Sequence, residues 1–224
     1  MMKAKTLFIA FLLGLSTNLM AQYEPTHKSD QSSGEDKPIK AFYAGFGTSL
    51  YGKYGYLGGS FGARIAPKTM GEFNVGIGAW GGKVGFALTT NVSNKNSWCP
   101  SIGFGRSSGI QGIQLPVILV PKAGGDEISV TTGVNLDPMN VIHLGVQKQI
   151  VSKKGGRFIF EFGYSLAVST TSYSFSDNTF TYNGVLVPTS AMDFSAAQKT
   201  AFKLLNPAGI MFNVSYVFGF GNYN

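Results

Sequence analysis

The stretch IHLGVQKQIVSKKGGRFIFEFGYSLAV, residues 142–168, decides the fold, because it contains two long alternating segments joined by a short polar turn. Successive side chains of a β-strand point to opposite faces of the sheet. Pairing Ile150 with Phe158 across the turn places Gln147 opposite Glu161, and the apolar faces of the two segments then coincide. The stretch therefore predicts an antiparallel hairpin with one large apolar face and one small polar face.

The same alternation extends over most of the chain and predicts ten strands. They lie near 41–51, 55–66, 72–80, 84–92, 98–105, 111–120, 127–136, 140–151, 157–171 and 208–220. Many of them are longer than the 5–6 residues usual in globular proteins and match the roughly 9–11 residues of a tilted membrane-spanning strand. Pro116 interrupts one candidate strand. If 110–138 is a folded-in loop, eight strands remain.

The composition agrees with strands that face lipid. Charged residues make up only 13% of the chain, aromatic residues another 13%, and 30 of the 224 residues are glycine. So few charges and so many aromatics exclude a disordered chain, and the glycine content argues against a helical protein. The aromatics lie on one strand face and the glycines on the other, the reverse of a soluble sandwich. We therefore predict an all-β protein, a closed antiparallel up-and-down transmembrane barrel with a narrow polar lumen.

The N-terminal region predicts export. Lys3 and Lys5 precede a compact apolar run over 7–15, and a small residue, Ala21, ends a typical cleavage site. We expect residues 1–21 to be a cleaved signal peptide. The polar segment 22–40 lacks apolar periodicity and is expected to be a flexible tether. Residues 41–224 would then form the barrel.

These features together resemble a known class of proteins. With its signal ending Met20-Ala21-Gln22, its alternating strands and its aromatic last strand at 210–220, the chain resembles the small outer-membrane β-barrel families of Gram-negative bacteria. The Ala-Gln junction resembles that of exported proteins of the Bacteroidota. The resemblance implies a place in the outer membrane, contact with its lipids, and assembly by the barrel-assembly machinery. We expect a monomer, and the scattered basic residues predict no nucleic-acid binding.

Several polar side chains fall on the presumed lumen face. Arg64, His143, Gln147, Glu161 and Ser165 are expected to join a polar network that fills the lumen, because charges in a closed interior need partners. His143 and Ser165 lie on paired strands, an arrangement that can support nucleophilic hydrolysis, but no convincing third group accompanies them. The sequence predicts no metal site and no cofactor.

One long connection, 171–207, interrupts the pattern of strands. Its second half predicts a short helix that Ser190 would cap, with Asp193 three residues further on. The apolar stripe of this helix would consist of Phe194, Ala197, Ala201, Leu204 and Leu205. The helix can act as a lid or recognition element, or it can simply pack on the rim of the barrel.

Three functions remain open at this point. The first is a small outer-membrane barrel with a structural or surface-interaction role and a filled lumen. The second is a narrow, porin-like channel or transporter for small or amphipathic solutes, gated by the 171–207 loop. The third is an outer-membrane enzyme that hydrolyses lipid or peptide, although the residues favour a protein without enzymatic activity.

Overall fold

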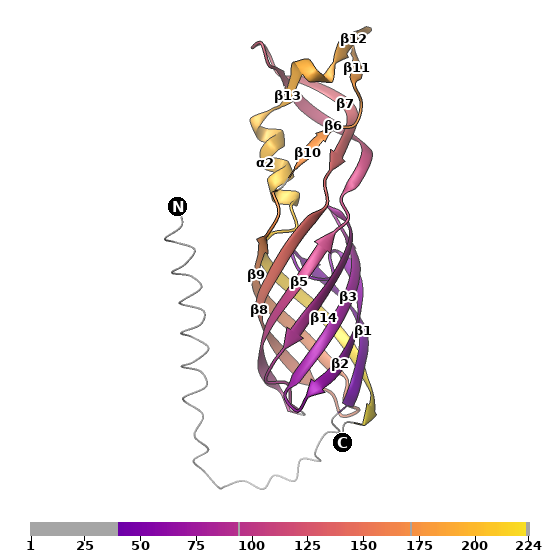
Figure 1. The fold of residues 1–224 in the computed structure, drawn as a ribbon, viewed down its shortest axis with the longest axis vertical. Helices are drawn as coiled ribbons and strands as arrows, with labels where there is room; N and C mark the ends of the chain where they lie inside the picture. The colour runs from indigo at the N-terminus through magenta and orange to yellow at the C-terminus, as the bar shows by residue number, and fades with distance from the viewer. Residues whose placement is uncertain (1–39, 94, 171, 223–224) are drawn as a thin grey trace, which may run out of the picture. The chain divides into compact units, whose positions relative to one another are not determined.

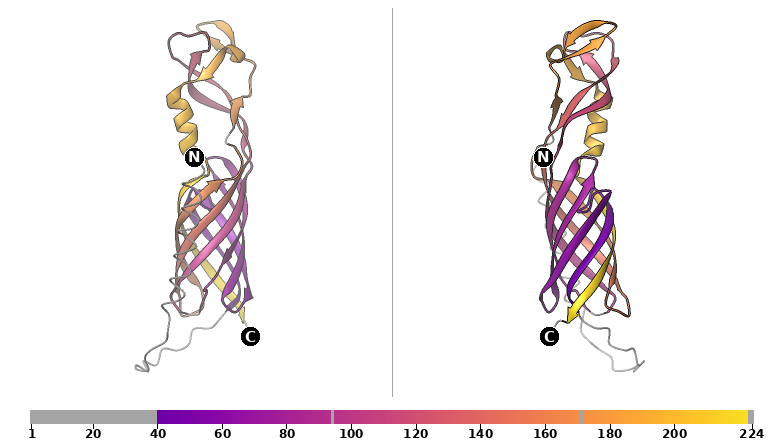
Figure 2. Two further views of the ribbon diagram at one scale, coloured as in Figure 1. Left: turned by 60° about the vertical axis from the view of Figure 1, so that its left-hand side comes forward. Right: turned by 90° about the vertical axis from the view of Figure 1, so that its right-hand side faces the viewer.

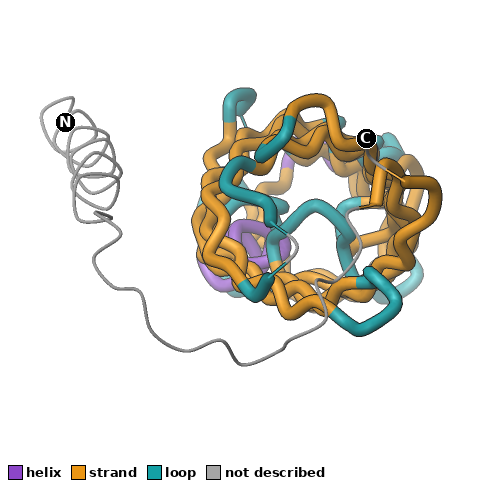
Figure 3. The backbone as a smooth tube through the Cα atoms, turned by 90° about the horizontal axis from the view of Figure 1, so that it is seen from below, coloured by secondary structure: helices purple, strands orange, loops and turns teal. Residues whose placement is uncertain are grey.

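The computed structural model describes residues 40–93, 95–170 and 172–222, most of which form antiparallel β-strands (Figure 1). Eight strands close into a barrel in the order β1-β14-β9-β8-β5-β4-β3-β2. They are β1 (Lys40–Leu50), β2 (Leu57–Ala66), β3 (Thr69–Gly78), β4 (Gly81–Thr89), β5 (Ser97–Ser107), β8 (Met139–Val151), β9 (Arg157–Ala167) and β14 (Gly209–Asn222). Viewed along its axis, the barrel is a ring of strands (Figure 3). The predicted closed antiparallel barrel is therefore confirmed.

The expected count of ten barrel strands is wrong, because the barrel formed by the described residues contains eight. The segments near 111–120 and 127–136 do form strands, β6 (Ile110–Pro121) and β7 (Ile128–Leu136), but these strands leave the wall. The wall closes without them because β5 pairs with β8 along its whole length. Gly109, directly before β6, has a φ of +73°, a left-handed conformation that suits glycine where the chain turns out of the wall.

β6 and β7 project beyond one end of the barrel and build a second sheet there (Figures 1 and 2). Its strand order is β10-β7-β6-β13, with β10 (Tyr173–Phe175) and β13 (Met192–Phe194) at its edges. A hairpin of β11 (Thr179–Tyr182) and β12 (Val185–Pro188), a 3-10 turn η1 (Thr189–Ala191) and the helix α2 (Ala196–Leu205) complete this part. We call residues 110–136 and 173–206 the cap.

The cap has a hydrophobic core of its own. Its buried members are Val117, Leu119, Val130, Val134, Leu136, Phe180, Met192, Phe194 and Phe202. The cluster continues into the barrel rim through Trp80, Met139 and Val141. These contacts explain why β6 and β7 leave the wall: their alternating apolar residues are buried against the long 171–207 connection instead of facing outward.

The helix in that connection begins later than the sequence predicts. Ser195, and not Ser190, is its N-cap, and the Ser195 hydroxyl accepts a hydrogen bond from the Gln198 backbone N–H at 3.2 Å. Ser190 lies in the preceding 3-10 turn. The predicted apolar stripe is also wrong, because Phe194 belongs to β13 and the last two members, Leu204 and Leu205, are 64% and 44% exposed. The remaining members, Ala197 and Ala201, do lie in the helix, but Phe202 is its buried anchor.

The two faces of the barrel wall differ sharply in polarity. Large apolar side chains cover the outside and remain exposed, among them Phe42, Phe46, Leu57, Phe61, Phe73, Ile77, Phe86, Ile102, Phe104, Phe158, Phe162, Ile210 and Phe218. Polar and charged side chains are buried on the inner face of the wall, in the lumen. The hairpin of β8 and β9 has the predicted register, with Ile150 opposite Phe158 and Gln147 opposite Glu161. Strand alternation was therefore sufficient to assign the two faces of this hairpin.

The predicted signal peptide, 1–21, lies outside the described residues, as does the predicted tether, 22–40, apart from Lys40, the first residue of β1. β1 begins and β14 ends at the same end of the barrel, since Lys40 is opposite Asn222 in their ladder. In the part of the chain that the structure describes, no helix has the length and apolar character needed to cross a membrane.

Candidate functional site

The connection between β1 and β2 folds into the barrel and fills its lumen at the end that carries the cap. Its residues Lys53 and Tyr54 are 5% and 0% exposed. The Ser49 backbone N–H donates to the Gly55 carbonyl oxygen at 2.6 Å and holds the two ends of this loop together. Gly76 on β3 makes room for the loop, because a Cβ atom there would overlap the carbonyl oxygen of Tyr54. We call residues 51–56 the plug loop.

A buried ion cluster attaches the plug loop to the wall. The Lys53 ammonium lies 2.9 Å from the Glu72 carboxylate on β3 and 3.6 Å from the Glu161 carboxylate on β9. The Tyr54 hydroxyl donates to Glu72 Oε1 at 2.9 Å. Glu161 also accepts hydrogen bonds from the Ser101 hydroxyl and, at 2.7 Å, from Asn213 Nδ2. Both carboxylates are thus paired with a cation and hydrogen-bonded, which a buried charge requires.

A second polar chain fills the opposite half of the lumen. Arg157 donates to the Tyr43 hydroxyl at 3.1 Å and to Gln149 Oε1 at 2.9 Å. Gln149 Nε2 donates to Gln147 Oε1 at 2.9 Å, and Gln147 Nε2 donates to the Thr89 hydroxyl at 3.2 Å. These bonds connect side chains from β1, β4, β8 and β9. The network therefore crosses the barrel from wall to wall.

His143 and Ser165 form a direct contact, with His143 Nδ1 2.7 Å from the Ser165 hydroxyl oxygen. The Ser165 hydroxyl donates its single proton to the backbone carbonyl oxygen of Tyr51. Toward His143 it must therefore accept, which assigns the proton of this contact to Nδ1. An imidazole nitrogen that carries a proton cannot take one from serine, so this geometry does not activate Ser165 as a nucleophile. Instead, the pair fastens the plug loop to β8 and β9.

The structure places all five predicted network residues inside the barrel, each at most 7% exposed. His143 contacts Ser165, Gln147 belongs to the chain that starts at Arg157, and Glu161 is ion-paired with Lys53. Arg64 Nη1 donates to the carbonyl oxygen of Pro67 at 2.7 Å, in the turn between β2 and β3.

Sequence reasoning did not name several lumen residues that this arrangement requires, among them Glu72, Arg157, Lys53 and Tyr54. Glu72 and Arg157 stand next to the outward-facing Phe73 and Phe158, so strand alternation alone could have placed them inside. Lys53 and Tyr54 lie in a connection, where alternation does not define a face. No local signal in the sequence indicates that this loop folds inward.

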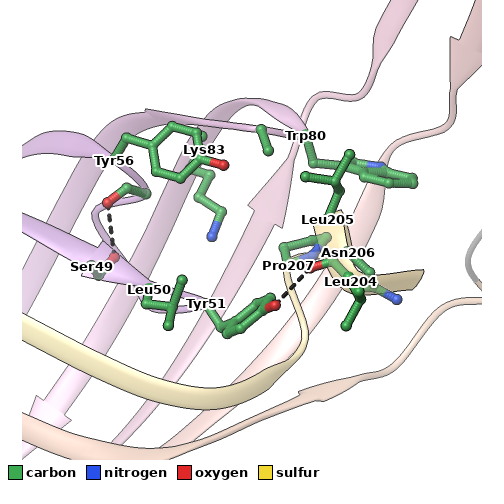
Figure 4. Close-up of a pocket in the computed structure, with 13 residues that line it drawn as sticks. Ser49, Leu50, Tyr51, Tyr56, Trp80, Lys83, Leu204, Leu205, Asn206 and Pro207 are labelled. Carbon is green, nitrogen blue, oxygen red and sulfur yellow. Dashed lines mark hydrogen bonds between the residues drawn. The ribbon is translucent and has the colours of Figure 1, made fainter. Parts of the chain in front are cut away.

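A small pocket lies at the mouth of the barrel, between its rim and the C-terminal end of α2 (Figure 4). Its volume is about 220 Å³. The lining side chains are mostly apolar or aromatic, including Leu50, Tyr56, Trp80, Leu204 and Leu205, together with the cationic Lys83. Tyr51 spans the pocket wall, since its hydroxyl donates to the Leu204 carbonyl oxygen at 2.6 Å. Tyr51 has a φ of 54°, an uncommon conformation for a residue other than glycine.

The residues that the structure describes contain no group of three or more His, Cys, Asp or Glu side chains placed to hold a metal ion. Cys99 is buried in the lumen near the short turns, where its thiol donates to the Asn91 carbonyl oxygen at 3.4 Å. The sites with defined chemistry are therefore the ion cluster, the His143–Ser165 contact and the pocket at the mouth. Comparison with known proteins found no matching family model, no matching curated protein and no matching solved structure.

Proposed function

We propose that this chain is a small outer-membrane β-barrel of a Gram-negative bacterium, of the kind found in the Bacteroidota, with a structural or surface-interaction role carried by its cap. The observation that supports this best is the polarity of the wall, which is apolar outside and charged inside. An exposed belt of phenylalanine and isoleucine is unfavourable in water and favourable against lipid tails. Closure of the sheet also leaves no unpaired backbone edge in lipid.

The filled lumen supports a structural or surface-interaction role over transport. The plug loop, its ion cluster and the Arg157 chain place buried, hydrogen-bonded side chains across the interior. An eight-stranded barrel has an interior just wide enough for side chains to fill. A planar-bilayer recording of the purified protein should show no discrete conductance steps, and open-channel steps would contradict this part of the proposal.

The lengths of the connections support an orientation with the cap outside the cell. Outer-membrane barrels have short periplasmic turns and long extracellular loops. Here the connections opposite the cap are short, for example Ser152–Gly156 between β8 and β9, whereas the cap itself is built from the two long excursions. The cap would therefore be the surface presented to the environment.

Cysteine labelling on intact cells tests both the membrane location and the orientation. Leu186, on β12 of the β11–β12 hairpin, is 69% exposed, and the native Cys99 is fully buried and so contributes little background. A Leu186→Cys variant should react with a membrane-impermeant maleimide on intact cells. A matched Lys153→Cys variant, in the short turn at the opposite end, should react only after the cells are opened. Equal labelling of the two variants, or recovery of the protein in the soluble fraction, would overturn the proposal.

A further inference from the structure

We propose that the pocket at the barrel mouth binds a small amphipathic anion, with its acidic head group at Lys83 and its apolar part against the leucines of α2 and the rim. This inference goes beyond a structural or surface-interaction role and does not depend on whether the lumen conducts. It rests on the placement of one cation and on the walls around it.

The cation is a buried lysine to which the structure assigns no acidic partner. Lys83, on β4, is 8% exposed, and its ammonium donates to the Gly52 carbonyl oxygen at 2.8 Å. The ion pairs among the described residues involve Lys53 and Lys199 and do not include Lys83. An ammonium has three protons to donate and is costly to bury without a counter-charge. A carboxylate or phosphate in the pocket would supply that counter-charge.

The walls of the pocket suit an apolar chain. Leu50, Tyr56, Leu204 and Leu205 contribute to the lining, and each of them is more than 40% exposed. Figure 4 shows the Lys83 side chain between Tyr56, the last residue of the plug loop, and the segment Leu204–Pro207 at the C-terminal end of α2. An acyl chain or another slender apolar body would cover these side chains while its head group reaches the ammonium.

The size of the pocket limits what it can hold. A volume of about 220 Å³ is below the roughly 300–1,000 Å³ typical of sites for drug-sized ligands. A single short acyl chain with a carboxylate head fits this limit, and so does one end of an anionic phospholipid. Both share the same chemistry, an acidic head on an apolar tail, and they differ in whether the ligand comes from solution or from the membrane.

Binding is best measured on the full-length protein in nanodiscs of zwitterionic phosphatidylcholine, because detergent tails would compete for the pocket. The chain has two tryptophans, and Trp80 lines the pocket whereas Trp98 is exposed on the outer wall. In a Trp98→Phe background, the fluorescence of Trp80 should therefore report occupancy. Sodium octanoate should give a saturable change, and 1-octanol, which lacks the charge, should bind at least about tenfold more weakly.

Variants of the pocket separate the role of the charge from that of the fold. Lys83→Gln should weaken octanoate binding to the level of octanol, and Lys83→Arg should retain most of it. If Lys83→Gln fails to fold, as judged by heat-modifiable gel migration, Leu205→Phe serves instead, because it adds no second tryptophan to the fluorescence signal. Leu205 is exposed, and a larger side chain there should fill the pocket and abolish binding. Retention of octanoate binding in folded Lys83→Gln or in Leu205→Phe would overturn the proposal, as would equal affinity for octanoate and octanol.

A last arm of the experiment identifies the source of the ligand. Nanodiscs that contain phosphatidylglycerol should lower the apparent affinity for octanoate if lipid head groups reach Lys83 from the membrane. Unchanged affinity would assign the site to soluble carboxylates. Either result supports the amphipathic-anion site, and the labelling on intact cells tests the membrane proposal separately.

Discussion

The Lys53 ammonium on the plug loop lies 2.9 Å from the Glu72 carboxylate on β3, and this contact fixes the loop inside the barrel. Both side chains are almost fully buried, so neither charge can be compensated by water if its partner is removed. Lys53 also lies 3.6 Å from Glu161, which makes one lysine the shared cation of two buried carboxylates.

Replacing Lys53 by methionine should therefore be strongly destabilising. Removing one partner of a buried ion pair typically costs about 3–5 kcal/mol, because the other charge is left uncompensated. Lys199→Met is the matched control: Lys199 pairs with Asp193 on the surface of the cap, where such a pair contributes about 1 kcal/mol or less. Guanidinium-induced unfolding in detergent micelles measures both. Similar losses for the two variants would show that the buried cluster does not hold the plug loop.

Gly76→Ala should displace the plug loop from the wall. A Cβ atom at this position would overlap the Tyr54 carbonyl oxygen, and forcing extra atoms into a packed interior costs about 1–3 kcal/mol. Gly59→Ala is a suitable control, because a Cβ there would meet only the Gly45 carbonyl oxygen at an ordinary 3.5 Å. The temperature at which gel migration changes on heating should fall for Gly76→Ala alone. An unchanged temperature would mean that the loop is not packed against β3.

The cap should lose its structure without loss of the barrel when its anchor is removed. Phe202 is 1% exposed and lies against Phe194 with a ring-centroid distance of 5.3 Å. Phe202→Ala should cost about 3–5 kcal/mol of cap stability, whereas Leu204→Ala, at an exposed position of the same helix, should stay within about 0.5 kcal/mol. Hydrogen exchange followed by mass spectrometry should show faster exchange in 110–136 and unchanged protection in β1 and β14. Uniformly faster exchange would instead indicate that cap and barrel unfold together.

Lowering the pH should weaken the ion pair between Lys199 and Asp193 on the cap. A hydrogen bond from Lys199, whose Nζ lies 2.6 Å from the Asp193 carboxylate, lowers the pKa of Asp193 below its ordinary value. Since the folded-state pKa is the lower one, the pair contributes its full stability above the ordinary pKa of about 3.9 and loses that stability as the pH falls through the folded-state pKa. In Lys199→Ala the Asp193 pKa should rise toward about 3.9, measured by NMR titration of the carboxyl carbon. An unchanged pKa would contradict this assignment.

The sequence predicted the barrel wall well because strand alternation is a local signal. The pairing of Gln147 with Glu161 follows from the hairpin alone, and the structure has that register. The same signal could not show which sheet a strand joins. β6 alternates like the wall strands, yet its residues Val117 and Leu119 are buried in the cap, because a partner from the distant 171–207 connection covers them. Only long-range packing distinguishes eight barrel strands from ten.

The start of the helix α2 and the ion cluster were less predictable, because they also depend on contacts between distant parts of the chain. Ser190 and Ser195 both carry a capping hydroxyl, and the choice between them depends on β13, whose pairing with β6 occupies the residues before Ser195. Lys53 lies in a connection without alternation, and its two carboxylate partners come from strands far apart in the chain. Such contacts become visible only when the barrel is closed.

The filled lumen also determines an order of events for a protein that must enter the outer membrane as proposed here. The cap comes from the middle and the later part of the chain, whereas the barrel is sealed by the first strand, β1, pairing with the last, β14. A chain cannot thread through an interior that is already packed with side chains. If the chain is an outer-membrane protein as proposed, its cap has to reach the cell surface while the β1–β14 seam is still open, and the pairing of these two strands then traps it there.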